Sequence, residues 1–462
     1  MRSEEHRVAA LNYAREHRAE HLEILLDYVA RPSISTQNIG VAECAAHSAS
    51  LLQSAGCTAR IIKSDGYPIV LGEMVAGPEA PTVLLYGHYD VQPPEPPEAW
   101  SSPPFEPEVR DGRVFGRGVA DNKGQHLAHI LAIKAYNETA GATPLNVKVL
   151  LEGEEESGSP HLDDFVRAHR DLLSCDLVIT SDGGADPSGR PLVSFGVRGM
   201  LSLELEARGA AMDLHSGRFG NIAPDPAMDL VDLLASMRDP DGRIVIEGFH
   251  DDVREPTLGE LELAAKVPYD AHEFARELGL AEPYVTDTLA YARGVMFEPT
   301  MTINGIASGH TGEGAKSIIA SHALVRLEFR LVVDQEPALI LEAVRAHVAK
   351  HAPHVEVRHE GAMAPSRSSA EMPAARLIID EVRAASGREP VVTPSAGGSL
   401  PGYVWTKTLG VPSVLVPYAN HDENNHSPNE NLTLDAFYGG IETSIYLLAA
   451  LAQGEWRLPT EP

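Results

Sequence analysis

The chain has few cysteines, few basic residues and no long apolar run, and each shortage excludes a class of protein. Cysteine occurs only three times in 462 residues, as Cys44, Cys57 and Cys175. These cysteines cannot all pair and none forms a Cys-x-x-Cys pattern, which favours reduced core residues over a disulfide framework. No apolar stretch approaches the length of a membrane span, and the charged first residues do not resemble a signal peptide. We therefore expect a soluble cytoplasmic protein with no membrane partner.

Basic residues are scarce relative to acidic ones. Lys and Arg together number 37, against 66 Asp and Glu, which gives a net charge of -29. A chain of this charge repels a phosphate backbone, so no nucleic-acid partner is expected. Hydrophobic residues make up 43% of the sequence, which is enough for a substantial core. The length predicts two or three structural units.

The pattern of predicted helices and strands changes twice along the chain. Residues 1–198 alternate between helices and short apolar strands, among them 69–74, 83–87, 145–151 and 177–180. From Gly199 the polar–apolar alternation at 201–206, 301–306 and 324–332 is typical of a sheet with one exposed face. The α/β pattern then returns and ends in a long apolar helix at 434–451. We predict an α/β domain in two parts, 1–198 and 363–462, around an inserted α+β domain at 199–362, in which segment 251–293 has the weakest pattern.

Two polar residues come shortly after the apolar run at 83–85, which Gly87 closes. His88 and Asp90 are two residues apart, so in extended backbone their side chains leave the same face. An imidazole and a carboxylate at the carboxyl end of a buried strand can begin a metal site. A hydrogen-bonded pair at a strand end explains the same pattern, and taken alone it is the favoured interpretation.

Four further segments carry candidate ligands at similar places. Asp121 lies on a Gly-rich turn before a predicted helix, where the ordinary role is a helix N-cap. The run Glu154–Glu156 follows a predicted strand, and three adjacent carboxylates gain most where a cation offsets their repulsion. Asp182 follows the strand at 177–180, and His426 lies in a polar loop before the last helix. Each position alone also suits an ordinary surface or capping residue.

Together these positions indicate one site at the edge where open α/β sheets bind ligands. Two imidazoles and three carboxylates suit a pair of divalent ions with one bridging carboxylate, rather than a thiolate cage. Such a pair would lower the pKa of a shared water and polarise a carbonyl, which is the chemistry of metal-assisted hydrolysis. Glu155, which points differently from its neighbour Glu156, is the candidate base for the proton of that water.

With these residues placed, the sequence resembles the M20 family of metallopeptidases, in the branch of carnosine-type dipeptidases. Four motifs carry the resemblance in the order of the family, at residues 87–92, 116–124, 151–159 and 426–430. The resemblance implies a zinc-peptidase-like α/β catalytic domain, in which helices flank a central mixed sheet. The insertion would be an α+β lid and dimerisation domain, which implies a homodimer.

The resemblance also assigns the ligands to two divalent ions per subunit. By this assignment His88 and Asp182 would bind one ion, Glu156 and His426 would bind the other, and Asp121 would bridge them. Zinc is the ion expected, with manganese or cobalt as alternatives.

Further roles follow from the same resemblance. Asp90 would orient His88, as a partner of a metal-binding imidazole commonly does. Glu155 would act as general base and then donate the proton to the leaving amine. The motif at 213–217 contains His215, which by analogy reaches into the site of the partner subunit and stabilises the oxyanion.

Three residues match positions that bind substrate in this family. Ser317 and Arg330 would hold the substrate, and Ser399 belongs to a loop that lines the pocket. Arg330 would pair with a free C-terminal carboxylate, which favours short peptides over proteins. Where related dipeptidases often carry Arg-Glu before this loop, the chain has Ser395 and Ala396.

The leading hypothesis is therefore a dinuclear-metal hydrolase of dipeptides or short peptides with a free carboxyl end. An N-acyl-amino-acid amidohydrolase would use the same metals and the same Arg330, with a pocket for an acyl group in place of a free amine. A catalytically silent metal-dependent binding protein is the alternative outside the hydrolases, and Glu155 argues against it.

Overall fold

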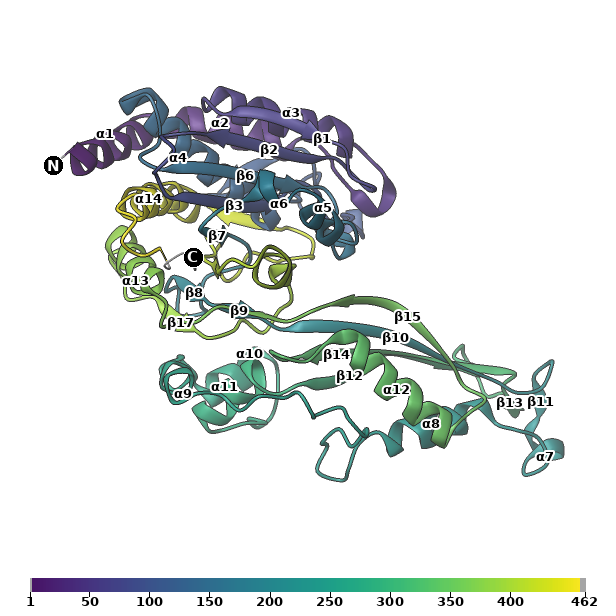
Figure 1. The fold of residues 1–462 in the computed structure, drawn as a ribbon. Coiled ribbons are helices and arrows are strands. Elements are labelled where there is room, and N and C mark those ends of the chain that lie inside the picture. The colour runs from purple at the N-terminus through teal and green to yellow at the C-terminus, as the bar shows by residue number, and fades with distance from the viewer. Residues whose placement is uncertain (1, 458–462) are drawn as a thin grey trace.

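The computed structural model describes residues 2–457, which form two bodies joined along one side (Figure 1). The larger body contains an eight-stranded sheet and the smaller body a four-stranded sheet. The chain enters the smaller sheet at β10 (Gly199–Arg208) and leaves it at the end of β15 (Glu356–Met363). These crossings lie beside the boundaries predicted from the sequence, and the inserted domain proposed here is residues 199–362.

The larger sheet is mixed. Its strands are, in spatial order, β1 (Thr58–Ile62), β2 (Ile69–Met74), β6 (Asn146–Glu152), β3 (Thr82–His88), β7 (Leu177–Thr180), β18 (Ser413–Leu415), β8 (Leu192–Ser194) and β17 (Val391–Thr393). The central neighbours β6, β3, β7 and β18 are parallel, whereas β1 and β2 are antiparallel. The four strands predicted in this region are confirmed, and the central strands end at a common edge.

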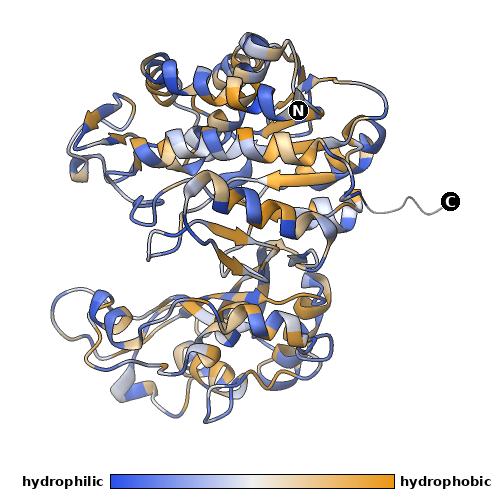
Figure 2. Ribbon diagram, turned by 90° about the vertical axis from the view of Figure 1, so that its left-hand side faces the viewer, coloured by the Kyte–Doolittle hydropathy of each residue, from blue (hydrophilic) through white to orange (hydrophobic). Residues whose placement is uncertain are grey.

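Helices cover both faces of this sheet, so its central strands are buried on both sides. Val83 and Leu85 pack in a core with α3 (Val41–Ser54), α4 (Gly124–Ala140) and α14 (Leu434–Leu451). Leu84 and Tyr86 face the other way and pack with α5 (Leu162–Ala168) and Trp405. Burial on both faces explains the continuous apolar runs of these strands, and Figure 2 shows them as orange strands between the helices.

The remaining elements of the larger body include several that the sequence did not predict. The unpredicted elements are α1 (Arg2–Glu16), β4 (Glu108–Arg110), β5 (Arg113–Phe115), β9 (Gly196–Val197), β16 (Ser366–Arg367) and β19 (Asn431–Thr433). The helices α2 (Arg18–Val29), α6 (Arg170–Leu173) and α13 (Pro373–Ser386) lie where the apolar pattern predicts helices. The first helix was missed because its buried stripe consists of only Ala10, Leu11 and Ala14. The helix predicted at 162–172 is divided at His169 into α5 and α6.

The smaller sheet is antiparallel, and its strands lie in the order β12 (Thr300–Ser308), β14 (His322–Leu331), β10 and β15. On one face Leu201, Leu203 and Leu205 pack against α8 (Pro226–Ser236) and α12 (Pro337–His351). The predicted alternation at 201–206 and 324–332 is confirmed, whereas β15 was not predicted. At the end away from the larger body lie β11 (Leu214–His215), α7 (Ser216–Phe219) and β13 (Ile318–Ile319) (Figure 1).

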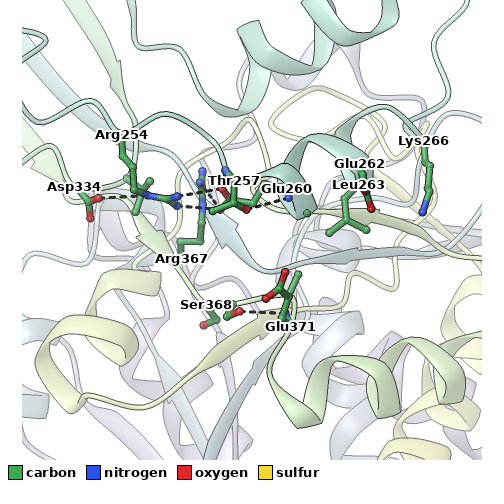
Figure 3. A pocket seen from close by; sticks show the side chains of 14 residues that line it. Arg254, Thr257, Glu260, Glu262, Leu263, Lys266, Asp334, Arg367, Ser368 and Glu371 are labelled. Atoms are coloured by element: carbon green, nitrogen blue, oxygen red, sulfur yellow. Dashed lines mark hydrogen bonds and ion pairs between the residues drawn. The ribbon is translucent and has the colours of Figure 1, made fainter.

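Three short helices lie between α8 and β12 in the sequence, and the first and third of them connect the two bodies. These are α9 (Leu258–Ala264), α10 (Ala271–Glu277) and α11 (Thr288–Met296). Ala264 and Met296 form a small apolar core with Val391 of the larger sheet, and Arg367 pairs with Glu260 at 3.0 Å. A cavity of about 540 Å³ opens at this junction (Figure 3), and none of the predicted site residues lines it.

Throughout the part of the chain that the structure describes, every helix is too short or too polar to cross a bilayer.

Candidate metal centre

The predicted ligands meet at the carboxyl edge of the larger sheet. His88 is the last residue of β3, Glu156 lies in the turn after β6, and Asp182 comes two residues after β7. Because these strands are parallel neighbours, their ends deliver the three side chains to one place. Asp121 joins them from the turn before α4, and His426 from the loop between β18 and β19.

The five side chains form two groups that share Asp121. Either group, His88–Asp121–Asp182 or Asp121–Glu156–His426, has ligand atoms within 4.8 Å of one another. The Oδ1 atom of Asp121 lies 3.0 Å from Nε2 of His88, and its Oδ2 lies 3.1 Å from Nε2 of His426. Asp121 thus turns one oxygen toward each histidine, which is the arrangement of a bridging carboxylate.

Positive charge is favoured at this centre. Burial opposes a charge on His88, but its bonds to Asp121 and Asp182 outweigh this effect and raise its pKa well above 6.5. Hydrogen bonds to Asp121 and Glu156 raise the pKa of His426 to about 10. Burial and, after it, the nearby carboxylate of Asp121 raise the pKa of Glu156 to about 7. A cation would offset the repulsion between these carboxylates.

The donor set fits two divalent ions. Carboxylate oxygens and imidazole nitrogens suit zinc, manganese or cobalt, and no thiol belongs to either group. His88, Asp121 and Asp182 are buried, whereas the side chain of His426 is 54% exposed. The second group therefore faces the side from which ions and substrate would enter.

Glu155 lies beside the two ligand groups. Its Oε2 is 4.0 Å from Nε2 of His88, and it lines a cavity of about 300 Å³ together with Asp121, Asp182 and His426. Burial and nearby carboxylates raise its pKa well above 4.5, with an opposing effect from His88. A carboxylate with a raised pKa at the wall of such a cavity is suited to accept and return a proton.

Asp90 touches His88 and also holds the turn that carries the base. Nδ1 of His88 is 3.1 Å from the backbone oxygen of Asp90 and 3.4 Å from its Oδ1. The carboxylate of Asp90 accepts the backbone N–H groups of Glu155, at 3.2 Å, and of Glu156, at 3.1 Å. One buried carboxylate therefore orients both a ligand and the turn after β6.

Arg330 and Ser399 meet between the two bodies. Nη1 of Arg330, on β14, donates to Oγ of Ser399 at 2.7 Å, and Ser399 lines the 300 Å³ cavity. Nε of Arg330 donates to Glu328 at 2.9 Å. Arg330 thus reaches from the smaller sheet to the rim of the metal centre.

His215 and Ser317 are not brought to the metal centre by their own chain. Both are exposed, and they lie together at the end of the smaller body away from the larger sheet (Figure 1). The backbone of this tip is closed by the pairing of Leu214 with Ile319 and by the bond from Ser216 N to Ser317 O.

Several residues near the ligands had no role assigned from the sequence. Gln92 donates to Glu156 at 2.9 Å, and the side chain of Asn122 bonds the segments that carry His88 and Asp182. Glu423 is buried, and burial raises its pKa to about 9. Glu430 was part of the 426–430 motif, which is the only signal that pointed to it.

Comparison with known proteins identifies the family. The model of peptidase family M20/M25/M40 matches residues 84–450. The Cys-Gly metallodipeptidase dug1 of Schizosaccharomyces pombe is 31% identical over 397 residues, 83% of each chain. The M20 family metallo-carboxypeptidase Sso-CP2 from Sulfolobus solfataricus is 33% identical with a TM-score of 0.89, over 94% of this chain and 99% of that one. Human carnosine dipeptidase 1 is 25% identical with a TM-score of 0.82, over 96% and 98%.

The chain therefore belongs to the M20 peptidase family and is a peptidase. The predicted fold class, a mixed sheet flanked by helices with an inserted α+β unit, is confirmed by the match to these solved structures.

Proposed function

We propose that this peptidase is a two-metal hydrolase that cleaves the amide bond of dipeptides or short peptides with a free C-terminal carboxylate. The observation that carries the proposal is the pair of ligand groups that share Asp121, with Glu155 beside them. The names of the relatives support it, since two are dipeptidases and one is a carboxypeptidase.

The five ligands would hold the ions as their contacts suggest. His88 and Asp182 would hold one ion, Glu156 and His426 the other, and Asp121 both. We propose zinc, with manganese and cobalt as alternatives, because nitrogen and oxygen donors suit all three. When bound, the two ions supply Lewis acidity and lower the pKa of a water.

The remaining steps belong to side chains of the protein. Glu155 takes the proton of the attacking water and returns it to the nitrogen of the leaving amine. Asp90 keeps Glu155 in place through the backbone bonds at 155 and 156. Arg330 binds the free carboxylate of the substrate with a charge-assisted pair, and Ser399 fixes the direction of its guanidinium.

We further propose that the protein acts in the cytoplasm as a homodimer assembled through the smaller body. The outer strand β12 exposes Ile303 and Ile306, and α8 exposes Met228 and Val231. Apolar side chains along a free sheet edge and a neighbouring helix suit contact with a second copy. His215 and Ser317 would then complete the site of the partner subunit, where His215 would donate to the oxyanion.

A second candidate is supported by the wall of the 300 Å³ cavity. Apart from the ligands and Glu155, this wall is uncharged and includes Gly183, Leu192, Ala396 and Pro417. No further carboxylate on it is available to pair with a substrate ammonium. This composition favours an uncharged group on the acyl side, as in an N-acyl-amino-acid amidohydrolase.

The test is a panel of dipeptides and their N-acetylated analogues, assayed with metal-stripped protein before and after zinc, manganese or cobalt is restored. Metal-dependent turnover of dipeptides is the expected result. Faster turnover of the acetylated compounds would establish the second candidate in place of the first. Normal metal binding without turnover of either set of compounds would refute both candidates and favour a catalytically silent metal-binding protein.

A further inference from the structure

The loop that carries His426 also carries Glu430, a buried acid with no part in the proposed reaction. Glu430 has no exposed surface. Its Oε2 accepts hydrogen bonds from Nη1 of Arg117 at 2.9 Å and from the backbone N–H of Gly118 at 2.8 Å. Its Oε1 accepts the backbone N–H groups of Ala120 at 2.9 Å and Asp121 at 3.0 Å. The last of these donors is the backbone of the bridging ligand itself.

The environment of Glu430 fits a carboxylate and little else. Two oxygens face four donors, one of them a guanidinium. Gly118 has a φ of 84°, a conformation that glycine adopts without strain and that helps the turn direct its N–H groups to one point. The turn before α4 is therefore wrapped around a single acid from a distant part of the sequence.

Arg117 extends this contact to a third segment. It is 1% exposed, donates to the backbone oxygen of Pro93 at 3.3 Å, and lies over the ring of Trp100 at 5.2 Å. The backbone oxygen of Glu430 accepts the N–H of Gly116 at 3.1 Å, just before β19 pairs with β5. The segments that follow His88, precede Asp121 and follow His426 are thus fastened together at Glu430.

We propose that Glu430 is a positioning residue that builds the Asp121–Glu156–His426 ion site. In this group Asp121 donates its backbone N–H to Glu430 directly, and His426 lies on the same loop as Glu430. In the His88–Asp121–Asp182 group only Asp121 has a direct bond, because the segment after His88 is reached indirectly, through Arg117 and the backbone oxygen of Pro93. Loss of Glu430 therefore weakens the first of these sites more than the second. This inference rests on the two-metal centre of the proposed function. It adds that, when Glu430 is replaced, the ion at the Asp121–Glu156–His426 site is lost first.

The experiment is a metal titration of the stripped Glu430→Gln protein. The variant keeps the size of the side chain but turns an NH2 group toward N–H donors, so the turn before α4 loses its anchor. The unaltered protein is expected to bind two equivalents of cobalt or zinc. In the variant one equivalent binds about 10- to 100-fold more weakly and the other changes less. Equilibrium dialysis counts the ions, and the visible spectrum of bound cobalt distinguishes the two sites.

A matched control is Glu260→Gln, which breaks another Arg–Glu pair with a buried guanidinium and whose recorded bonds go to Arg254, Thr257 and Arg367, none of them a candidate ligand. It is expected to bind both ions normally. Arg117→Lys keeps a cation but cannot serve both Glu430 and Pro93, and a smaller shift at the same site is expected; this variant decides the matter if Glu430→Gln does not fold.

Two ions bound with unaltered affinity in both Glu430→Gln and Arg117→Lys would overturn the inference and leave the two-metal centre intact. Equal weakening of both sites, or the same loss in Glu260→Gln, would also overturn it, because the effect would then be a general loss of stability. If the unaltered protein bound no metal, the proposed function itself would fail.

Discussion

The larger and the smaller body contribute to the site in different ways. The larger body brings all five candidate ligands and Glu155 together in one subunit, with ligand atoms a few ångströms apart. The smaller body places Arg330 at the rim of the same cavity, but holds His215 and Ser317 at its far end. The candidate ligands therefore meet within one chain, whereas His215 and Ser317 would reach a substrate only in the proposed dimer.

This difference follows from how each body positions its side chains. Parallel strands of a sheet fix the ends of β6, β3 and β7 within one layer, so residues far apart in sequence converge without any partner. The tip of the smaller body is held by the two-residue strands β11 and β13 and by a few hydrogen bonds beside them. This tip lies at the end away from the larger body (Figure 1), and in the proposed dimer a second copy would bring its residues to a metal centre.

The largest effect is expected at Glu155. Glu155→Ala should lower kcat by roughly 10²- to 10⁴-fold, because the attacking water loses its general base, while metal content stays at the level of the unaltered protein. Steady-state kinetics with metal analysis provides the measurement. Glu154→Gln is the control, because this neighbouring carboxylate bonds His161 instead; a similar loss there would show that the turn, not the base, was disturbed.

The proposed difference between the two bodies requires that His215 acts in the partner subunit rather than in its own chain. His215→Ala alone should lower kcat by roughly 10²- to 10³-fold, through loss of an oxyanion donor. Mixed subunits of His215→Ala and Glu155→Ala should recover about a quarter of full activity, since each heterodimer has one intact composite site. Activity is measured after unfolding and refolding the two variants together. No recovery in verified heterodimers would refute the exchange of His215 between subunits.

A smaller effect is expected at Arg330. Arg330→Met should raise KM about 10- to 100-fold with less change in kcat, because the substrate carboxylate loses a charge-assisted bond of roughly 1.5–3 kcal/mol. Dipeptides and their C-terminal amides are compared in initial-rate assays, and the variant should no longer discriminate between them. Arg326→Met, four residues earlier on β14 and paired with Glu204 at the surface, should leave KM unchanged.

The sequence predicted the metal centre more fully than the rest of the molecule, for a physical reason. His88 ends a continuous apolar strand and Asp182 comes two residues after another, so their place at the sheet edge could be derived from local pattern. The bond between Asp121 and Glu430 could not be predicted from local pattern, because the two residues are more than three hundred positions apart and only folding brings them together. The helices of segment 251–293 were hard to predict because they bury few side chains, such as Ala264 and Ala292, against the larger body.

The smallest effect concerns the junction of the two bodies, and it depends on pH. Burial opposes ionisation of Glu260, but bonds from Arg254 and the backbone of Thr257 outweigh it and lower its pKa to about 2. A lowered folded-state pKa stabilises the protein above the unfolded value near 4.5, and this contribution is lost as the pH falls toward 2. Glu260→Gln should therefore cost about 1–3 kcal/mol at neutral pH and progressively less below pH ~4.5. Urea unfolding of the metal-stripped proteins measures this difference in the free energy of unfolding. A difference that did not shrink in acid would show that Glu260 contributes through packing rather than charge. Glu262→Gln, on the exposed side of α9, serves as control.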